Sequence, residues 1–203
     1  MRFQLISMLK RIPLLLHLIS RVGHATEKSA YPFPKQAYSL ASIELDHLVS
    51  AKIRGIILDL DNTIISEDDR YLSPNALGWI AQARKLNLKL FILSNGKRHY
   101  RVEHWSQHLD IPAINPAKKP FPGAFHKAIR HMQLTPNQVV VIGDSRHTDV
   151  LGAWWVGCPS IQVASLPHPR RWWEKLLGKH VQIPYPKEHE LWEYQSPNLY
   201  RNP

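Results

Sequence analysis

The stretch that decides the fold is Ile56–Ile65, which reads IILDLDNTII. A short run of apolar residues stops at two carboxylates, Asp59 and Asp61, and this pattern predicts a buried strand that ends in acidic side chains. Because open α/β sheets bind their ligands at the carboxyl edge of the strands, we expect both acids to lie in a site at that edge. In such a pair, one acid can attack a phosphoryl group while the other moves a proton.

Further strands and helices are predicted to alternate on both sides of this stretch. The expected strands are Arg54–Leu60, Leu88–Leu93, a very short Ala113–Ile114, Val139–Ile142 and Ser160–Val163. The expected helices are Ser39–Val49, Pro74–Leu86 with Ser73 as its N-cap, Lys97–Leu109, Gly123–Met132 and His147–Val156, and Asp61–Ser73 is expected to be a polar loop. Short linkers between alternating strands and helices indicate a parallel sheet with helices on both faces. The predicted fold is therefore an α/β, Rossmann-like three-layer sandwich.

The composition is typical of a globular protein with one substantial domain. The chain has 203 residues, of which 44% are hydrophobic and 21% charged. Its formal net charge of +10 favours anionic partners, and phosphorylated substrates, lipid head groups and nucleic acid all remain open on this ground. The single cysteine, Cys158, excludes an intramolecular disulfide and a cysteine-rich zinc site. Its apolar surroundings indicate a buried and inert thiol.

The amino-terminal segment is basic and amphipathic. Its apolar run, Ile12–Ile19, is too short to span a bilayer, which takes about 20 apolar residues. Three interpretations stay open for this segment: a helix that lies in a membrane interface, a targeting signal, and a helix packed on the domain. The expected organisation is this segment over residues 1–30, a domain over 31–168, and a Trp- and Pro-rich extension over 169–203 with a short helix at Arg170–Leu177.

Polar side chains lie at or just after the ends of four of the predicted strands. They are Asp59, Asp61 and Thr63; Ser94 and Asn95; Lys118 and Lys119; and Asp144 and Asp149. If the strands are parallel neighbours, all of these groups meet at one edge of the sheet. Carboxylate oxygens suit Mg²⁺, while hydroxyl, amide and ammonium groups suit a phosphate. The sequence therefore predicts a site for magnesium-assisted phosphoryl transfer.

The order and spacing of these groups resemble four motifs of the haloacid-dehalogenase-like (HAD) superfamily of phosphatases. The D-x-D-x-T motif corresponds to Asp59–Thr63, the strand that ends in serine to Ser94, the lysine to Lys119 because Pro120 follows it, and G-D-x4-D to Gly143–Asp149. The segments KPFPGAFHKAI and GDSRHTDVLGAWWVG further resemble the YqeG subgroup, which is related to mitochondrial phosphatidylglycerophosphate phosphatases. Ser145 stands where that subgroup usually has glutamine, and Gly96 where it frequently has asparagine.

The resemblance implies a division of roles among these residues. Asp59 would attack phosphorus and form an aspartyl-phosphate, and Asp61 would protonate the leaving group and then activate water. The implied phosphate-binding residues are Thr63, Ser94, Asn95 and Lys119. The implied cofactor is Mg²⁺, with Asp59, Asp61 (through its backbone carbonyl), Asp144 and Asp149 around it, the last supporting either the metal or Lys119.

The gaps between the motifs are too short for a cap domain over the site. Thr63–Ser94 and Asn95–Lys118 each have room for about one helix, whereas a domain usually takes about 50 residues or more. An open site suits a large or anchored substrate. The leading hypothesis is that the protein dephosphorylates phosphatidylglycerophosphate to phosphatidylglycerol, as a cytoplasmic protein on the inner face of an anionic membrane. The alternatives are a soluble capless phosphatase acting on a phosphoprotein, a nucleic-acid end or a sugar phosphate, and a nucleic-acid-binding or assembly factor with a vestigial site.

Overall fold

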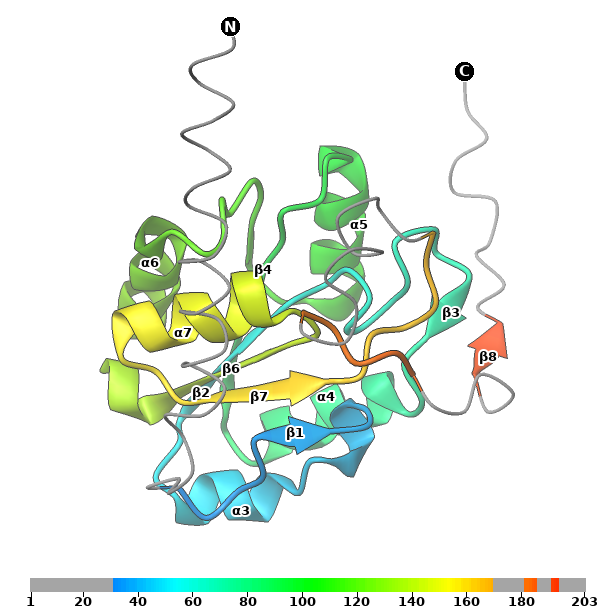
Figure 1. Ribbon diagram of the computed structural model, residues 1–203. Coiled ribbons are helices and arrows are strands. Elements are labelled where there is room, and N and C mark those ends of the chain that lie inside the picture. The colour runs from blue at the N-terminus through cyan, green and yellow to red at the C-terminus, as the bar shows by residue number, and fades with distance from the viewer. Residues whose placement is uncertain (1–30, 170–180, 186–190, 194–203) are drawn as a thin grey trace, which may run out of the picture.

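The computed structural model describes residues 31–169, 181–185 and 191–193 (Figure 1). The strands are β1 (Gln36–Ala37), β2 (Gly55–Leu58), β3 (Tyr71–Leu72), β4 (Lys89–Leu93), β5 (Ala113–Ile114), β6 (Val139–Gly143), β7 (Ser160–Val163) and β8 (Trp192–Glu193). The α-helices are α3 (Leu45–Ser50), α4 (Ala76–Lys85), α5 (His99–Leu109), α6 (Pro122–Met132) and α7 (Leu151–Val156). Short 3₁₀ helices η1 (Leu40–Ser42) and η2 (Pro136–Gln138) and a π-helical turn η3 (Arg146–Val150) complete the set.

Six of these strands form one parallel sheet in the order β1-β7-β6-β2-β4-β5. The central strand β2 pairs with β4 and with β6, so that Leu58 is level with Ile92 and Ile142. The chain therefore leaves these strands at one edge of the sheet, and the residues that follow them are close together. The predicted α/β class with a parallel sheet is confirmed.

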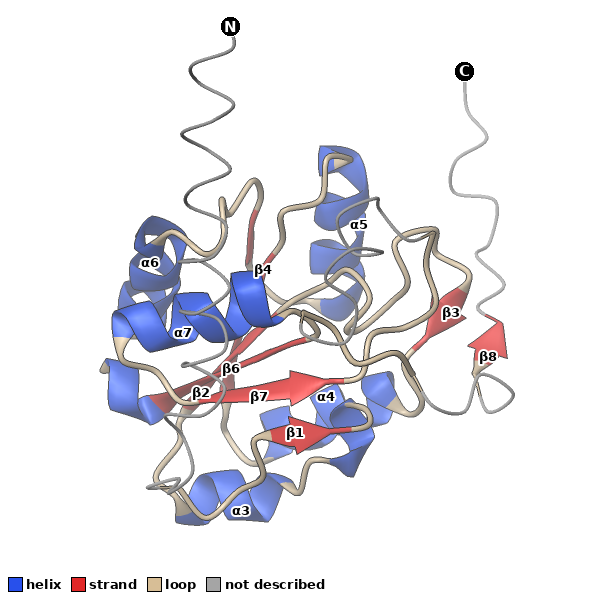
Figure 2. Cartoon of the chain, in the orientation of Figure 1, coloured by secondary structure: helices blue, strands red, loops and turns tan. Residues whose placement is uncertain are grey.

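Helices cover both faces of the sheet (Figure 2). On one face, Ile56 and Leu58 of β2 share a buried core with residues of α3, α4 and α5. On the other face, Ile57 packs among residues of α6 and α7. Cys158 belongs to this second core, so its predicted burial is confirmed, and burial raises the pKa of its thiol to about 12, which disfavours the reactive thiolate.

The helix predicted over Ser39–Val49 is broken into η1 and α3. The backbone N–H of Ser39 donates to Ser42 Oγ at 3.0 Å, and that hydroxyl donates to the carbonyl of Ser39 at 2.8 Å. These bonds close a short turn, after which Ile43 is extended and buried. A single helix is wrong here because local serine hydrogen bonds compete with the helical ones.

The N-terminal turns of two other helices differ from expectation, and α5 begins at His99, two residues after the expected Lys97. Helix α4 begins at Ala76, and its N-cap is Asn75 in the left-handed region at φ 51°, where Ser73 was expected to be the cap. The carbonyl of Ser73 instead accepts the N–H of Ala76 at 3.0 Å in the turn before the helix. The helix predicted from His147 opens with the π-helical turn η3 before α7. The predicted polar loop also contains β3, which pairs with β8 in an antiparallel ribbon.

No cap domain is inserted between the motifs, all of which lie in the continuously described residues 31–169. The segment before Ser94 holds β3 and α4, and the segment before Lys118 holds α5 and β5. The amphipathic segment over residues 1–30 and the helix predicted at Arg170–Leu177 lie outside the described residues. Among the helices that the structure describes, none has the length and apolar character needed to cross a membrane.

Candidate active site

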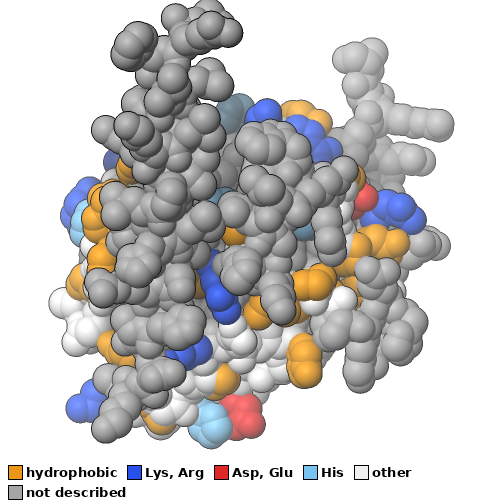
Figure 3. Space-filling model, in the orientation of Figure 1, with side chains coloured by type: hydrophobic (Ala, Val, Ile, Leu, Met, Phe, Trp, Pro, Cys, Tyr) orange, Lys and Arg blue, Asp and Glu red, His pale blue; other side chains and the backbone are white. Residues whose placement is uncertain are grey.

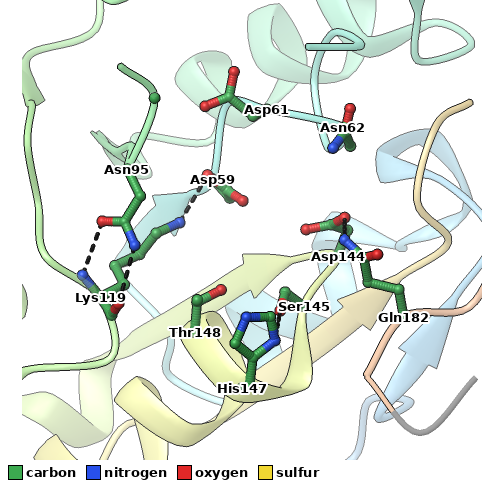
Figure 4. A pocket seen from close by; sticks show the side chains of 11 residues that line it. Asp59, Asp61, Asn62, Asn95, Lys119, Asp144, Ser145, His147, Thr148 and Gln182 are labelled. Atoms are coloured by element: carbon green, nitrogen blue, oxygen red, sulfur yellow. Dashed lines mark hydrogen bonds and ion pairs between the residues drawn. The ribbon is translucent and has the colours of Figure 1, made fainter. Parts of the chain in front are cut away.

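A pocket lies at the carboxyl edge of the central strands (Figure 4). Its lining comes from the loops after β2, β4 and β6 and from two further segments: Asp59, Asp61, Asn62, Asn95, Gly96, Lys119, Asp144, Ser145, His147, Thr148 and Gln182. The structure thus brings together most of the residues predicted from the sequence. The others, Thr63, Ser94 and Asp149, are buried and do not line the pocket.

Lys119 sits between two of the acids. Its Nζ lies 2.7 Å from Asp59 Oδ1 and 2.6 Å from Asp149 Oδ1, and its side chain is 2% exposed. Burial alone would lower the pKa of Lys119, but attraction to Asp149 and Asp59 outweighs burial and raises that pKa, so the side chain stays cationic. Asn95 fixes the lysine backbone, because its Nδ2 donates to the Lys119 carbonyl and its Oδ1 accepts the Lys119 N–H, both at 2.9 Å. Lys118 is exposed and does not line the pocket, which supports Lys119 as the site lysine.

Three buried carboxylates converge beside this lysine. One oxygen each of Asp59, Asp144 and Asp149 lie within 4.8 Å of one another. Burial and then the charge of Asp149 raise the pKa of Asp144 to about 7. The same two causes raise the pKa of Asp59 well above its ordinary value, and Lys119 opposes that rise. One ammonium therefore faces up to three negative charges, and a hard divalent cation fits the remaining charge and the oxygen donors.

The roles within this acidic cluster are unequal. Asp149 is engaged at both oxygens: Oδ1 with Lys119, and Oδ2 with the Ser145 N–H at 3.2 Å and the Thr148 hydroxyl at 3.1 Å. Asp59 and Asp144 line the pocket. The residues present thus fit Mg²⁺: Asp59 and Asp144 would be the carboxylates that face it, and Asp149 is the partner that holds Lys119.

We expect Mg²⁺ to raise the melting temperature more at pH 8 than at pH 6. Burial keeps Asp144 protonated in the folded state up to about pH 7, whereas the unfolded chain loses that proton near the ordinary pKa of 3.8. Stability from this group therefore falls as pH rises between these two values and is fully lost above about 7. Cation binding needs the ionised form of Asp144 and restores the lost stability. A Mg²⁺ concentration of a hundred times Kd adds about 2.7 kcal/mol to the free energy of unfolding, and each kcal/mol raises the melting temperature by about 2–4 °C. Thermal scans with and without Mg²⁺ measure this, and an equal Mg²⁺ shift in Asp144→Asn would contradict it.

Asp61 lies beside the cluster and is held by two donors. The Ser94 hydroxyl donates to Asp61 Oδ2 at 2.8 Å, and the Arg101 guanidinium donates to Asp61 Oδ1. Ser94 Oγ also accepts the Gly96 N–H at 2.9 Å, so the expected phosphate contact of Ser94 would require its hydroxyl proton to turn away from Asp61. A Cβ on Gly96 would lie 2.9 Å from Asp61 Oδ2, so the glycine leaves room for this carboxylate.

Thr63 was expected to bind phosphate, but its side chain is buried and does not line the pocket. Its side chain is 1% exposed, and its Oγ1 has no hydrogen-bond partner among the described residues. The neighbouring Asn62 lines the pocket at φ 61° and accepts the Glu67 N–H at 2.9 Å through Oδ1, which shapes the loop after β2. Phosphate binding by Thr63 stays a prediction.

Sequence reasoning missed Gln182. Its Nε2 donates to Asp144 Oδ2 at 2.7 Å, next to the Ser165 hydroxyl, which donates to the same oxygen at 2.7 Å. Backbone bonds from Arg146 N–H to the Val181 carbonyl and from Ser165 N–H to the Ile183 carbonyl hold this segment across the end of the sheet. The glutamine lies in a tail without periodicity, and no sequence signal pointed to it.

Arg101 was also missed, although a signal for it exists. The buried positions of α5 are Arg101, Val102, Trp105 and Leu109, so the arginine occupies an apolar stripe of the helix. A cation on such a stripe is rarely buried unless it is paired. The pattern could therefore have predicted a buried acidic partner for Arg101.

The parallel sheet and the lysine-bridged acids at its carboxyl edge define the class of protein. The chain belongs to the haloacid dehalogenase-like hydrolase family. The model of that family, described as "Hydrolase: haloacid dehalogenase-like hydrolase", matches residues 50–157. The match ends at α7, so the segment that carries Gln182 lies beyond it.

The chain is also similar to individual proteins. The chain is 39% identical over 107 residues to "Probable phosphatase YqeG" of Bacillus subtilis (strain 168), a match that spans 53% of this chain and 62% of the relative. The chain thus matches less than two thirds of the length of that relative. Among solved structures, it is similar to a HAD phosphatase from Thermococcus onnurineus (TM-score 0.49, 16% identity, 62% of this chain and 98% of that one). A further similar structure is an uncharacterized protein from Corynebacterium glutamicum (TM-score 0.45, 20% identity, 63% and 95%).

Proposed function

We propose that this protein is a Mg²⁺-dependent phosphomonoesterase that works through an aspartyl-phosphate. The observation that carries the proposal is the position of Asp59, which lines the pocket while Lys119 holds its Oδ1 at 2.7 Å. A carboxylate in this place can attack phosphorus, and the ammonium reduces repulsion between two anions. Asp61 lines the same pocket, which makes its carboxylate the second acid available to a substrate bound there.

The proposed reaction uses two acids in sequence. Asp59 Oδ attacks phosphorus as the bond from phosphorus to the ester oxygen breaks, and Asp61 gives a proton to that oxygen. Asp61 then takes a proton from water, which attacks the aspartyl-phosphate and releases inorganic phosphate and free Asp59. Lys119 stabilises charge on the phosphoryl oxygens. Mg²⁺ held by Asp59, Asp144 and the Asp61 carbonyl would neutralise the phosphoryl group and orient it for in-line attack.

For the substrate, we propose phosphatidylglycerophosphate at an anionic membrane surface. The resemblance to the YqeG subgroup supports this, and so does the absence of a cap between the motifs in residues 31–169. Phe121, two residues beyond Lys119, is 63% exposed, and Trp155 is 53% exposed with its ring centroid 6.3 Å from that of Phe121. Exposed aromatic side chains are suited to a membrane interface. Lys and Arg side chains are visible at several places on the face shown in Figure 3.

We expect kcat/KM for phosphatidylglycerophosphate in anionic vesicles to exceed that for a phosphopeptide or a sugar phosphate by more than about tenfold, which is about 1.4 kcal/mol of added binding. The double variant Phe121→Ser/Trp155→Ser should lose more activity on vesicles than on a soluble short-chain ester. Turnover assays with each substrate measure both effects.

Tyr38 provides the matched control, because it is 66% exposed and stands on the loop after β1, away from the pocket lining. Tyr38→Ser should behave as the unaltered protein on vesicles. Preference for the phosphopeptide or the sugar phosphate would reject the lipid substrate and favour a soluble capless phosphatase. Equal losses for Phe121→Ser/Trp155→Ser and Tyr38→Ser would reject this aromatic pair as the membrane contact.

A further inference from the structure

Arg101 is a buried cation that reaches from α5 to the candidate active site. Its side chain is 2% exposed, and its guanidinium donates to Asp61 Oδ1. The Nε atom lies 2.6 Å from Asp69 Oδ1, and the remaining terminal nitrogen donates to the Ser66 carbonyl at 2.8 Å. All three nitrogens of the guanidinium are thus engaged, and Asp61 is the partner that lines the pocket.

A purely structural role would be to dock the loop around Asp69 onto α5. Other contacts already serve that purpose: Trp105 Nε1 donates to Asp69 Oδ1 at 3.3 Å, and Arg98 donates to the Glu67 carbonyl. Docking therefore does not require a guanidinium that also reaches Asp61. Burying a cation costs several kcal/mol before its pairing is counted, so its direction toward a pocket residue calls for a functional account.

We propose that Arg101 is a positioning residue that fixes the carboxylate of Asp61 for proton transfer to the leaving group. The proposal rests on the proposed phosphatase reaction. Asp61 is 18% exposed, and each of its oxygens has a donor behind it, Ser94 on Oδ2 and Arg101 on Oδ1. Because Arg101 is itself fixed by Asp69 and Ser66, it cannot follow a moving Asp61.

The contact with Arg101 limits the orientations that the Asp61 carboxylate can take. A side chain of the length of aspartate would otherwise rotate about two torsions, and a displacement of about 1 Å of a reacting group can cost about a hundredfold in rate. The planar fork of arginine fixes both distance and direction, which the point charge of lysine does not. Arg101 itself does not line the pocket and gives no proton.

The test compares two esters with different needs for a proton. An alkyl phosphate needs protonation of its leaving oxygen, whereas 2,4-dinitrophenyl phosphate releases a stable anion. For Arg101→Met, we expect kcat/KM to fall by about ten- to a hundredfold on the alkyl ester and by less than about threefold on the aryl ester. Arg101→Lys keeps the charge and should lie between Arg101→Met and the unaltered protein. An unchanged ratio of the two kcat/KM values in folded Arg101→Met, or in Arg101→Lys if the former does not fold, would overturn the proposal.

A double-mutant cycle separates positioning from lost stability. If Arg101 acts through Asp61, then adding Arg101→Met to Asp61→Asn should change kcat/KM by less than about twofold, while independent effects would multiply. Trp105→Phe removes a hydrogen bond from the same network and should lower the melting temperature without changing the ratio between esters. Multiplying losses would overturn the proposal for Arg101 while leaving the phosphatase intact. An unaltered protein that hydrolyses neither ester would instead reject the proposed function.

Discussion

Replacement of Asp59 by asparagine is expected to lower phosphatase activity by at least about a thousandfold, as loss of a nucleophile commonly does. The amide cannot form the aspartyl-phosphate, although it keeps the size of the side chain. The fold should survive, because burial and Asp149 already raise the pKa of Asp59 and disfavour its charge, and Lys119 keeps Asp149 as a partner. Steady-state kinetics with Mg²⁺ and a soluble ester measure the effect.

The matched control is Asp110→Asn. Asp110 has a 97% exposed side chain and ends α5 at φ 51°, a conformation that asparagine accepts readily. Its replacement should leave kcat unchanged. Loss of a nucleophile is expected to lower activity by about a thousandfold. If Asp59→Asn instead kept activity within about tenfold of the unaltered protein, Asp59 would not be the nucleophile.

The second large effect is expected for Lys119→Met. The variant leaves Asp59 and Asp149 facing each other without the ammonium that lies 2.7 and 2.6 Å from them. Removal of one partner from a buried ion pair costs about 3–5 kcal/mol of unfolding free energy. Activity should fall as well, because no cation would remain there for the phosphoryl oxygens. The loss of stability should shrink at low pH, where protonation removes the repulsion between the acids.

Lys118→Met is the natural comparison for this variant, since it changes the adjacent residue in the same way. Lys118 is exposed, and surface substitutions usually change stability by less than about 0.5 kcal/mol. Denaturant unfolding of the two variants gives the difference directly. Equal unfolding free energies for Lys118→Met and Lys119→Met would show that Lys119 does not neutralise the buried acids.

Much of the fold follows from local patterns in the sequence. The strands β7 (Ser160–Val163) and β5 (Ala113–Ile114) have the predicted bounds. The ends of β2 and β6 differ from the predicted ends by two residues at most. Continuous apolar runs between short helical segments leave few alternatives to a parallel sheet. The convergence of Asp59, Lys119 and Asp144 in one pocket then follows from topology, because parallel strands end at the same edge.

The rest depends on contacts that local patterns do not encode. Gln182 reaches Asp144 from 38 residues away. The hydroxyl of Ser94 donates to Asp61 at 2.8 Å, and this partner depends on the packing of the loop after β4, which the strand pattern does not encode. The break at Ile43 depends on competition between serine hydrogen bonds and helical ones, whose free energies differ little.

The central claim is that Asp59 carries the phosphoryl group during turnover. The most direct test is to quench the protein with borohydride during hydrolysis of a phosphate ester in the presence of Mg²⁺. Borohydride reduces an aspartyl-phosphate to homoserine, which mass spectrometry locates in the peptide that contains Ile56–Ile65. We predict homoserine at position 59 only when substrate is present, and none in Asp59→Asn. Turnover without homoserine at position 59, or with homoserine at another aspartate, would contradict the account.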